Sequence, residues 1–316
     1  MNRTLILTHA DLDGLVSGIL LLTRLGCDAG VKITNGSGLA KAIRSEIANE
    51  GPVNSAYISD IPLDRIRIDE VYDALEMLSE QGATLHLYDH HKGWNETANR
   101  RFCPMFSTYN VDEHKTTAAA LIWRDFLNRD MHCQRWLELL SKKDRSTDGS
   151  VADDFRILAA LMQPEYVRRR SEIMRSLAFG TSIGDRCEIV NWYLTEHLPR
   201  ERNLAEHADV FETRSGRRIG WIDLRGEPGL YANIGKLVIE YHSVDLAASV
   251  IHNGVLLGGV SIDRGIDLSF LHGCHNIDGI GLEVVGHKSP VRLRPIDGVV
   301  SDEFVLAAKS LITDRI

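Results

Sequence analysis

The segment TLILTHADLDG, residues 4–14, joins a short apolar run to a cluster of acidic and imidazole side chains. The run TLILT has the length and composition of a buried strand. The polar cluster that follows contains His9, Asp11 and Asp13, and after Gly14 the chain becomes rich in Leu and Ile. We therefore expect a strand that ends at the polar cluster and a helix that begins just after it.

Three similar apolar runs follow, VKIT at 31–34, SAYIS at 55–59 and TLHLY at 84–88. Amphipathic stretches near 14–25, 38–49 and 69–80 lie between the four runs. Strands that alternate with helices predict an α/β fold, a parallel sheet with helices on both faces. In such folds, ligands gather at the carboxyl ends of the strands.

The rest of the chain has a different pattern. Residues 115–198 show helical spacing and are expected to complete the first domain and form a helical connector. After Pro199 we predict a hairpin turning at Ser215-Gly216, a helix near 230–242, strands within 246–254 and 255–263, a helix near 276–285 and a strand near 291–296. This order predicts a smaller C-terminal α/β domain with a mixed sheet, so the expected domains are 1–190 and 191–316.

The composition is that of a folded protein large enough for two domains. The 316 residues are 44% hydrophobic and 25% charged. With 36 basic and 44 acidic residues, the net charge is -8. Binding to long nucleic acid depends on clustered Lys and Arg, so this charge disfavours a partner such as long duplex DNA or RNA. A local basic pocket for a short substrate is still compatible with it.

The sequence also predicts the cellular compartment of the protein. The N-terminus turns polar after one short apolar run, unlike a secretory signal, and no run reaches the ~18 apolar residues of a membrane span. The five cysteines are odd in number and contain no CxxC pair, which fits reduced thiols. We expect a cytoplasmic protein without a membrane partner.

Polar clusters follow three of the predicted strands. The first strand ends in His9, Asp11 and Asp13, the third in Asp60, and the fourth in Asp89-His90-His91. In a parallel sheet these clusters meet at one edge, where their carboxylates would repel each other by several kcal/mol unless a cation lies between them. If the first cluster is extended, its three ligands point to the same side.

Mixed imidazole and carboxylate ligands suit Mn²⁺, Fe, Zn²⁺ or Co²⁺ better than Ca²⁺, and this number of carboxylates favours two cations with Asp60 as a bridge. Mn²⁺ is the first choice. Each cluster alone is more simply explained as a helix cap or as surface polar residues. Three of them at successive strand ends exceed what capping requires, which favours the metal interpretation.

The stretches HADLDG, ISD and DHH, in this order, resemble the DHH phosphoesterase superfamily, and the second half resembles the DHH-associated C-terminal domain. The resemblance covers nearly the whole chain. It implies metal-dependent hydrolysis of phosphoesters, in the branch of oligoribonucleases and nucleoside bisphosphate phosphatases. It also implies that residues 1–190 carry the metal site and catalysis, and that residues 191–316 bind substrate.

The resemblance also assigns roles to residues. It implies that His9 and Asp11 bind one cation, that Asp13 and His90 bind the other, and that Asp60 bridges the two. A further Asp completes the second site, with Asp144 as the candidate and Asp148, Asp153 and Asp154 as alternatives. His91 is implied to face the substrate phosphate or the leaving oxygen, supported by Asp89.

The implied substrate-binding residues are Gly286, His287, Lys288 and Arg264. The family usually has a glycine-rich run before the His, whereas this chain has Val284-Val285-Gly286. Two glycines are missing, so the close backbone approach to a phosphate is in doubt there.

The predicted function is a phosphodiesterase or phosphatase that uses two divalent cations, with Mn²⁺ first and Mg²⁺ or Co²⁺ as alternatives. The expected substrates are short oligoribonucleotides, linear dinucleotides or 3'-phosphoadenosine 5'-phosphate. Two alternatives stay open: a polyphosphate or pyrophosphate hydrolase, and a non-catalytic nucleotide sensor. A homodimer is compatible with the sequence.

Overall fold

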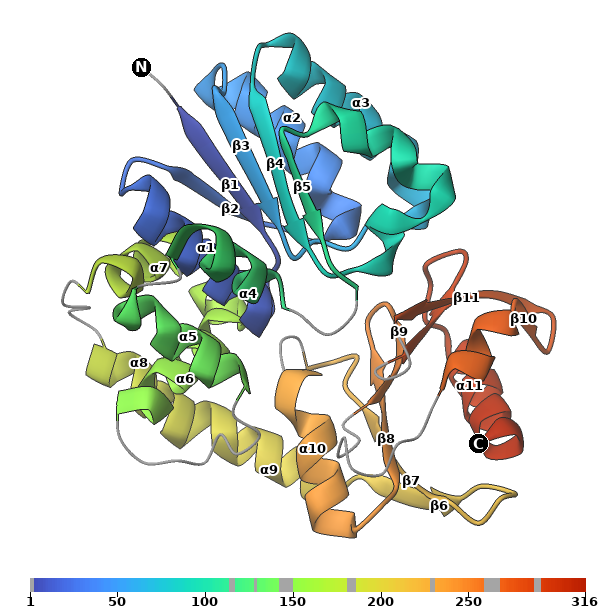
Figure 1. The fold of residues 1–316 in the computed structure, drawn as a ribbon. Helices are drawn as coiled ribbons and strands as arrows, with labels where there is room; N and C mark the ends of the chain where they lie inside the picture. Colours follow the sequence, from blue (N-terminus) through green and yellow to red (C-terminus); the bar gives the residue numbers. More distant parts are fainter. Residues whose placement is uncertain are drawn as a thin grey trace. The chain divides into compact units, whose positions relative to one another are not determined.

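The computed structural model describes residues 3–113, 117–127, 130–141, 150–180, 186–227, 231–258, 268–286 and 291–316. The chain forms two compact units, Met1–Val190 and Asn191–Ile316. Each unit has its own sheet (Figure 1). The predicted fold class, a parallel-sheet α/β domain followed by a smaller domain with a mixed sheet, is confirmed.

The sheet of the first unit is parallel throughout, with the strand order β2-β1-β3-β4-β5. Its strands are β1 (Thr4–Thr8), β2 (Gly30–Ile33), β3 (Ser55–Ser59), β4 (Thr84–Asp89) and β5 (Thr108–Val111). The short strand β5 was not among the strands predicted from the sequence. Leu5 and Leu7 face one side of the sheet and Ile6 the other, and all three are fully buried. Burial on both sides explains why the strand sequences are almost continuously apolar.

Helices cover both faces of this sheet. The helices described in this unit are α1 (Leu12–Leu25), α2 (Leu39–Glu50), α3 (Ile68–Glu80), α4 (Ala118–Ile122), α5 (Met131–Ser141), α6 (Ser150–Leu161), α7 (Arg170–Phe179) and α8 (Arg186–Trp192), whose last residues belong to the second unit. Helices α2 and α3 share one core with the sheet, whereas α1 and α4 pack against its other face (Figure 1).

The strand order determines where a ligand can bind. The chain passes from β1 to β2 on one side and then returns to β3 on the other side of β1. The connections that follow β1 and β3 therefore diverge, which leaves a crevice at the carboxyl ends of these two strands. The polar residues after β1 and β3 lie at this position.

The second unit contains a mixed sheet in the order β10-β11-β12-β9-β8-β7-β6. Its strands are β6 (Asp209–Glu212), β7 (Arg218–Asp223), β8 (Leu246–Ile251), β9 (Gly254–Gly258), β10 (Asn276–Ile277), β11 (Ile280–Gly286) and β12 (Val291–Pro295). Among the described strands of this sheet, only β7 and β8 pair in parallel, joined through α10 (Tyr231–His242). Helices α9 (Leu198–Glu206) and α10 share a core with one face, and α11 (Asp302–Arg315) with the other. The predicted hairpin at Ser215-Gly216 is confirmed by the pairing of β6 with β7.

The predicted helix near 276–285 is wrong, because these residues form the hairpin of β10 and β11. Asp278 and Gly279 make its turn with φ angles of 51° and 86°. An Asp-Gly pair between apolar residues is a strong signal for a two-residue hairpin turn. Leu282 and Val284 are buried at a spacing of two residues, as in a strand.

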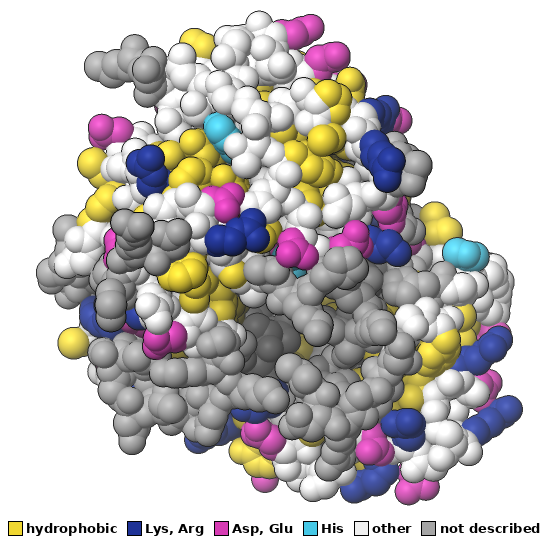
Figure 2. All heavy atoms as spheres, viewed as in Figure 1, with side chains coloured by type: hydrophobic (Ala, Val, Ile, Leu, Met, Phe, Trp, Pro, Cys, Tyr) yellow, Lys and Arg dark blue, Asp and Glu magenta, His cyan; other side chains and the backbone are white. Residues whose placement is uncertain are grey.

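Among the helices in the described ranges, none is long and apolar enough to cross a membrane. On the face shown in Figure 2, Lys and Arg side chains are dispersed, and several lie beside Asp or Glu. The described residues form no continuous basic stripe on that face.

We expect Gly36→Ala to destabilise the first unit. A Cβ atom at Gly36 would lie 2.1 Å from the carbonyl oxygen of Pro62, and this main-chain atom cannot move away cheaply. The free energy of unfolding should fall by about 1–3 kcal/mol, as for other overpacked sites. Gly30→Ala is the matched control, since its new Cβ would make only ordinary contacts. Urea unfolding monitored by circular dichroism tests this, and equal stabilities of the two variants would contradict it.

Candidate metal centre

The loop after β1 places His9 and Asp11 side by side. Asp11 caps α1, because its Oδ1 accepts a hydrogen bond from the N–H of Gly14 at 3.0 Å. Its Oδ2 lies 2.9 Å from Nδ1 of His9. The prediction of an extended segment over residues 9–13 needs correction, since α1 begins at Leu12 and Asp13 lies in its first turn. Capping and metal binding use different oxygens of Asp11, so they do not exclude each other.

Asp13 is held by the start of α4. Its Oδ2 accepts from the N–H of Ala118 at 2.9 Å and its Oδ1 from the N–H of Ala119 at 3.1 Å. The side chain of Thr117 caps the same helix end. Oδ2 of Asp13 also lies 3.6 Å from Nε2 of His90. Two main-chain donors thus fix the carboxylate beside the imidazole.

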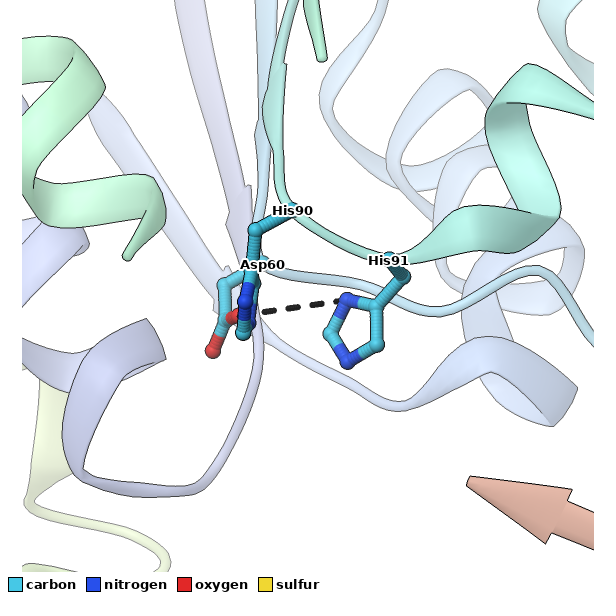
Figure 3. A group of neighbouring side chains, drawn as sticks. All are labelled: Asp60, His90 and His91. Atoms are coloured by element: carbon cyan, nitrogen blue, oxygen red, sulfur yellow. Dashed lines mark ion pairs between the residues drawn. The ribbon is translucent and has the colours of Figure 1, made fainter. Parts of the chain in front are cut away.

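Asp60 lies at the centre of the site. It follows β3 with a φ angle of 57° and is fully buried. Its Oδ1 lies 3.0 Å from Nε2 of His90, which follows β4 (Figure 3). This is ion-pair distance, but neither oxygen of Asp60 accepts a hydrogen bond of good geometry. A strained backbone and an unsatisfied buried carboxylate are costly, and they are typical of functional sites.

Asp89 and His91 form a supporting pair. The buried carboxylate of Asp89 accepts from the N–H groups of Ile61 at 2.7 Å and His91 at 2.6 Å. It also lies 2.7 Å from Nδ1 of His91. This bond orients the imidazole ring and assigns the Nδ1 proton to the side of Asp89. Burial lowers the pKa of His91, but the charge and hydrogen bond of Asp89 outweigh it, so the net pKa is raised.

The remaining carboxylates strongly influence one another. Burial raises the pKa of Asp13 to about 6, and the charge of Asp11 adds to this increase. Burial and the charges of Asp11 and Asp13 hold the pKa of Asp60 well above its usual value. The surrounding protein also opposes ionisation of Asp11, but the neighbouring imidazole of His9 holds the pKa of Asp11 below the usual range. These carboxyl groups therefore cannot all be ionised at low cost without a cation.

The donor atoms fit two adjacent cations. One group contains His9, Asp11 and Asp60, and a second contains Asp60, His90 and His91; within each group the donor atoms lie within 4.8 Å of one another. Asp60 belongs to both groups. Nδ1 of His9 and both oxygens of Asp60 are buried without a hydrogen bond, as expected for atoms that would bind metal. Carboxylate and imidazole side chains are common ligands of divalent metals.

The structure thus brings together seven of the residues predicted for the site: His9, Asp11, Asp13, Asp60, Asp89, His90 and His91. The predicted Asp144, Arg264, His287 and Lys288 lie outside the described residues, as does Asp148. Gly286 is the last residue of β11, paired with Val291 of β12.

Two alternatives to Asp144 have other partners. Asp154 is buried and ion-paired with Arg186 at 2.7 Å and Arg135 at 3.9 Å. Asp153 pairs with Arg156 at 2.9 Å. Both carboxylates therefore already have cationic partners.

Sequence reasoning missed the main-chain donors of Ala118 and Ala119. Thr117 precedes Ala118 in the sequence, and Thr is a common N-cap residue, so a helix start can be predicted at this position. The sequence gives no sign that the exposed amides of this helix end point at Asp13, about one hundred residues away in the chain.

The comparisons with known proteins concern the fold. No protein-family model matches the chain, and no curated protein matches it. Among solved structures, it is similar to a DHH domain described as belonging to a family of ribosomal proteins. That match has 13% identity and a TM-score of 0.69 and covers 100% of this chain and 88% of the other.

Two structures of the exonuclease RecJ with manganese are also similar. One has 14% identity and a TM-score of 0.51 and covers 99% of this chain and 89% of the other. The second, from Thermus thermophilus, has 14% identity and a TM-score of 0.57. There the match covers 98% of this chain but only 51% of the other, so the chain spans about half of that protein. These likenesses show that the chain has the DHH fold, which confirms the expected fold.

We expect Mn²⁺ to stabilise the protein and Asp60→Asn to abolish this effect. A cation bound only by the folded state adds about 2.7 kcal/mol at a concentration one hundred times its Kd. Without metal, Asp60→Asn should be at least as stable as the wild type, because it removes a buried charge that has no hydrogen bond. Thermal unfolding with and without Mn²⁺ measures both effects.

Asp154→Asn is the matched control. It makes the same change at a buried carboxylate that is paired with arginines. This variant should lose about 3–5 kcal/mol without metal and keep the stabilisation by Mn²⁺. If Asp60→Asn kept that stabilisation as well, the assignment of Asp60 to the metal centre would be wrong.

Proposed function

We propose that this protein is a metal-dependent phosphoesterase. The observation that carries the proposal is the convergence of five donor residues at the carboxyl ends of β1, β3 and β4: His9, Asp11, Asp13, Asp60 and His90. Ligands bind at this edge in parallel α/β sheets. The likeness in fold to the exonuclease RecJ bound to manganese supports both the metal and the reaction class.

In this proposal, His9 and Asp11 would hold one divalent cation, Asp13 and His90 would hold the other, and Asp60 would be shared by both. Two such cations supply a water nucleophile at neutral pH and neutralise the charge that grows on the phosphate oxygens. Mn²⁺ is the proposed metal, with Mg²⁺ and Co²⁺ as alternatives. The chain positions these ligands through the α1 cap at Asp11 and the α4 amides at Asp13.

His91 is assigned to proton transfer rather than to a cation. Its Nδ1 lies 4.0 Å from Asp60 but only 2.7 Å from Asp89, which already binds it. With the ring oriented in this way, Nε2 is the atom that can donate a proton to the leaving oxygen. The hydrogen bond to the carboxylate of Asp89 favours the protonated form that this step requires.

The proposed substrates are short: oligoribonucleotides of a few units, linear dinucleotides or 3'-phosphoadenosine 5'-phosphate. The net charge of -8 fits a small anion better than a long strand. The second unit is proposed to bind the substrate, with Arg264, Gly286, His287 and Lys288 as its contacts. The cytoplasmic location and the homodimer stay predictions.

A substrate panel tests the function. A ribodinucleotide, a longer single strand, 3'-phosphoadenosine 5'-phosphate and polyphosphate are each incubated with Mn²⁺, Mg²⁺ or Co²⁺, and the products are separated by chromatography. We expect hydrolysis of the ribodinucleotide or the bisphosphate with Mn²⁺, and none by Asp60→Asn. Phosphate release from polyphosphate alone would support the phosphoanhydride alternative. Nucleotide binding without bound metal and without turnover would support the sensor.

We expect His91→Ala to lower kcat by about 100-fold or more, the usual contribution of a general acid. The affinity for Mn²⁺ should change little, because His91 is not assigned as a ligand. His86→Ala is the control, since His86 lies in β4, which ends just before His91, and its ring stacks on that of Tyr57 with the ring centroids 4.3 Å apart. Steady-state kinetics and metal titration separate the two effects. A large loss of Mn²⁺ affinity with His91→Ala would instead make this residue a metal ligand.

A further inference from the structure

Two buried hydroxyl groups join the segments that carry the metal ligands. Thr8 is the last residue of β1 and Ser59 the last residue of β3, and they are paired in the sheet. Both are fully buried. The hydroxyl of Ser59 donates to Oγ1 of Thr8 at 3.1 Å, and the Thr8 hydroxyl donates to the carbonyl oxygen of Gly14.

These hydrogen bonds have a specific position relative to the ligands. Ser59 directly precedes Asp60, Thr8 directly precedes His9, and Gly14 directly follows Asp13. The path from Ser59 through Thr8 to Gly14 therefore connects the residue next to the bridging carboxylate with the first turn of α1.

Two glycines of α1 allow this connection. A Cβ atom at Gly14 would lie 2.5 Å from the carbonyl oxygen of His9. One at Gly18 would lie 2.4 Å from the terminal methyl group of Met174 and 3.2 Å from the methyl group of Thr8. A larger residue at Gly14 would push the first turn of α1 away from the main chain that follows β1, and one at Gly18 would tighten the contact with Thr8. The absence of side chains at these positions lets α1 lie close enough for the Thr8 hydroxyl to reach it.

We propose that Thr8 and Ser59 are positioning residues, whose hydroxyl groups set the distance between the ligands on α1 and the bridging ligand Asp60. The inference rests on the proposed function, because it assumes that these carboxylates hold two cations. Thr8 contacts no reacting atom and acts through the placement of Asp13 and Asp60. Residues that orient metal ligands in this way typically contribute 10- to 100-fold to metal affinity.

The principal test variant is Thr8→Val, which keeps the branched shape and removes the hydroxyl. We expect the affinity for Mn²⁺, measured by titration calorimetry, to fall by about 10- to 100-fold. Thr8→Ser keeps the hydroxyl and should restore most of the affinity. The magnetic coupling between two bound Mn²⁺ ions, measured by electron paramagnetic resonance, should change in Thr8→Val and return in Thr8→Ser. A purely structural role would not alter this coupling.

Thr23→Val is the matched control. Thr23 lies near the other end of α1, and its hydroxyl donates to the carbonyl oxygen of Ile19 at 2.9 Å. The substitution removes the same group from the same helix and should leave the affinity for Mn²⁺ unchanged. If Thr8→Val bound Mn²⁺ as tightly as Thr23→Val, the proposal would be overturned.

Ser59→Ala tests the same path from the other strand. It should weaken Mn²⁺ binding less than Thr8→Val, because Thr8 keeps its bond to Gly14. The double variant should be no weaker than Thr8→Val alone, since Ser59 acts through Thr8. If Thr8→Val does not fold, Ser59→Ala decides the question, and an unchanged affinity overturns the proposal. A wild-type protein that binds no pair of Mn²⁺ ions would defeat the proposed function itself, a result distinct from failure of the Thr8 variants.

Discussion

The constraint on which the site depends is the burial of Asp60 without a hydrogen bond of good geometry. A carboxylate removed from water normally accepts several hydrogen bonds from N–H or O–H groups. Neither oxygen of Asp60 does so, although Nε2 of His90 lies 3.0 Å from Oδ1. Asp11 and Asp13 approach it from α1 and raise the cost of ionising it. A folded protein keeps such an arrangement only if a bound ligand offsets the cost of burying the carboxylate or if the surrounding structure holds the carboxylate in place. The parallel sheet holds it in place, because its strand order requires the ends of β1 and β3 to meet.

The carboxylates around Asp60 are held in place in a different way from Asp60 itself. Asp13 and Asp89 are also close to the imidazoles, but each accepts two main-chain hydrogen bonds. Those two carboxylates are therefore fixed in orientation by the backbone, whereas the orientation of Asp60 depends on its own unusual backbone angle. Fixed neighbours around one unsatisfied group make a preorganised site, in which little has to move when a cation binds.

Much of this arrangement could be predicted from the sequence. The apolar runs located β1, β3 and β4, and in a parallel sheet their polar ends must converge, so the meeting of His9, Asp60 and His90 followed from local patterns. The contacts that depend on distant main chain could not be predicted. The amides that hold Asp13 belong to Ala118 and Ala119, and no side-chain pattern indicates where an amide points. The hairpin turning at Asp278-Gly279 is different, because its turn signal was present in the sequence although a helix was predicted there.

The two roles of Asp11 have a consequence for how this site would change during evolution. One carboxylate oxygen of Asp11 caps the N-terminus of α1, and the other faces His9. A single residue therefore serves both the folding of the helix and the chemistry of the centre. A lineage that abandoned the reaction would still need an acceptor at this position, and Asp, Asn or Ser would satisfy it. After a loss of activity, the residue at position 11 would therefore change little. Substitutions would appear first at Asp60, which has no comparable role in starting the helix.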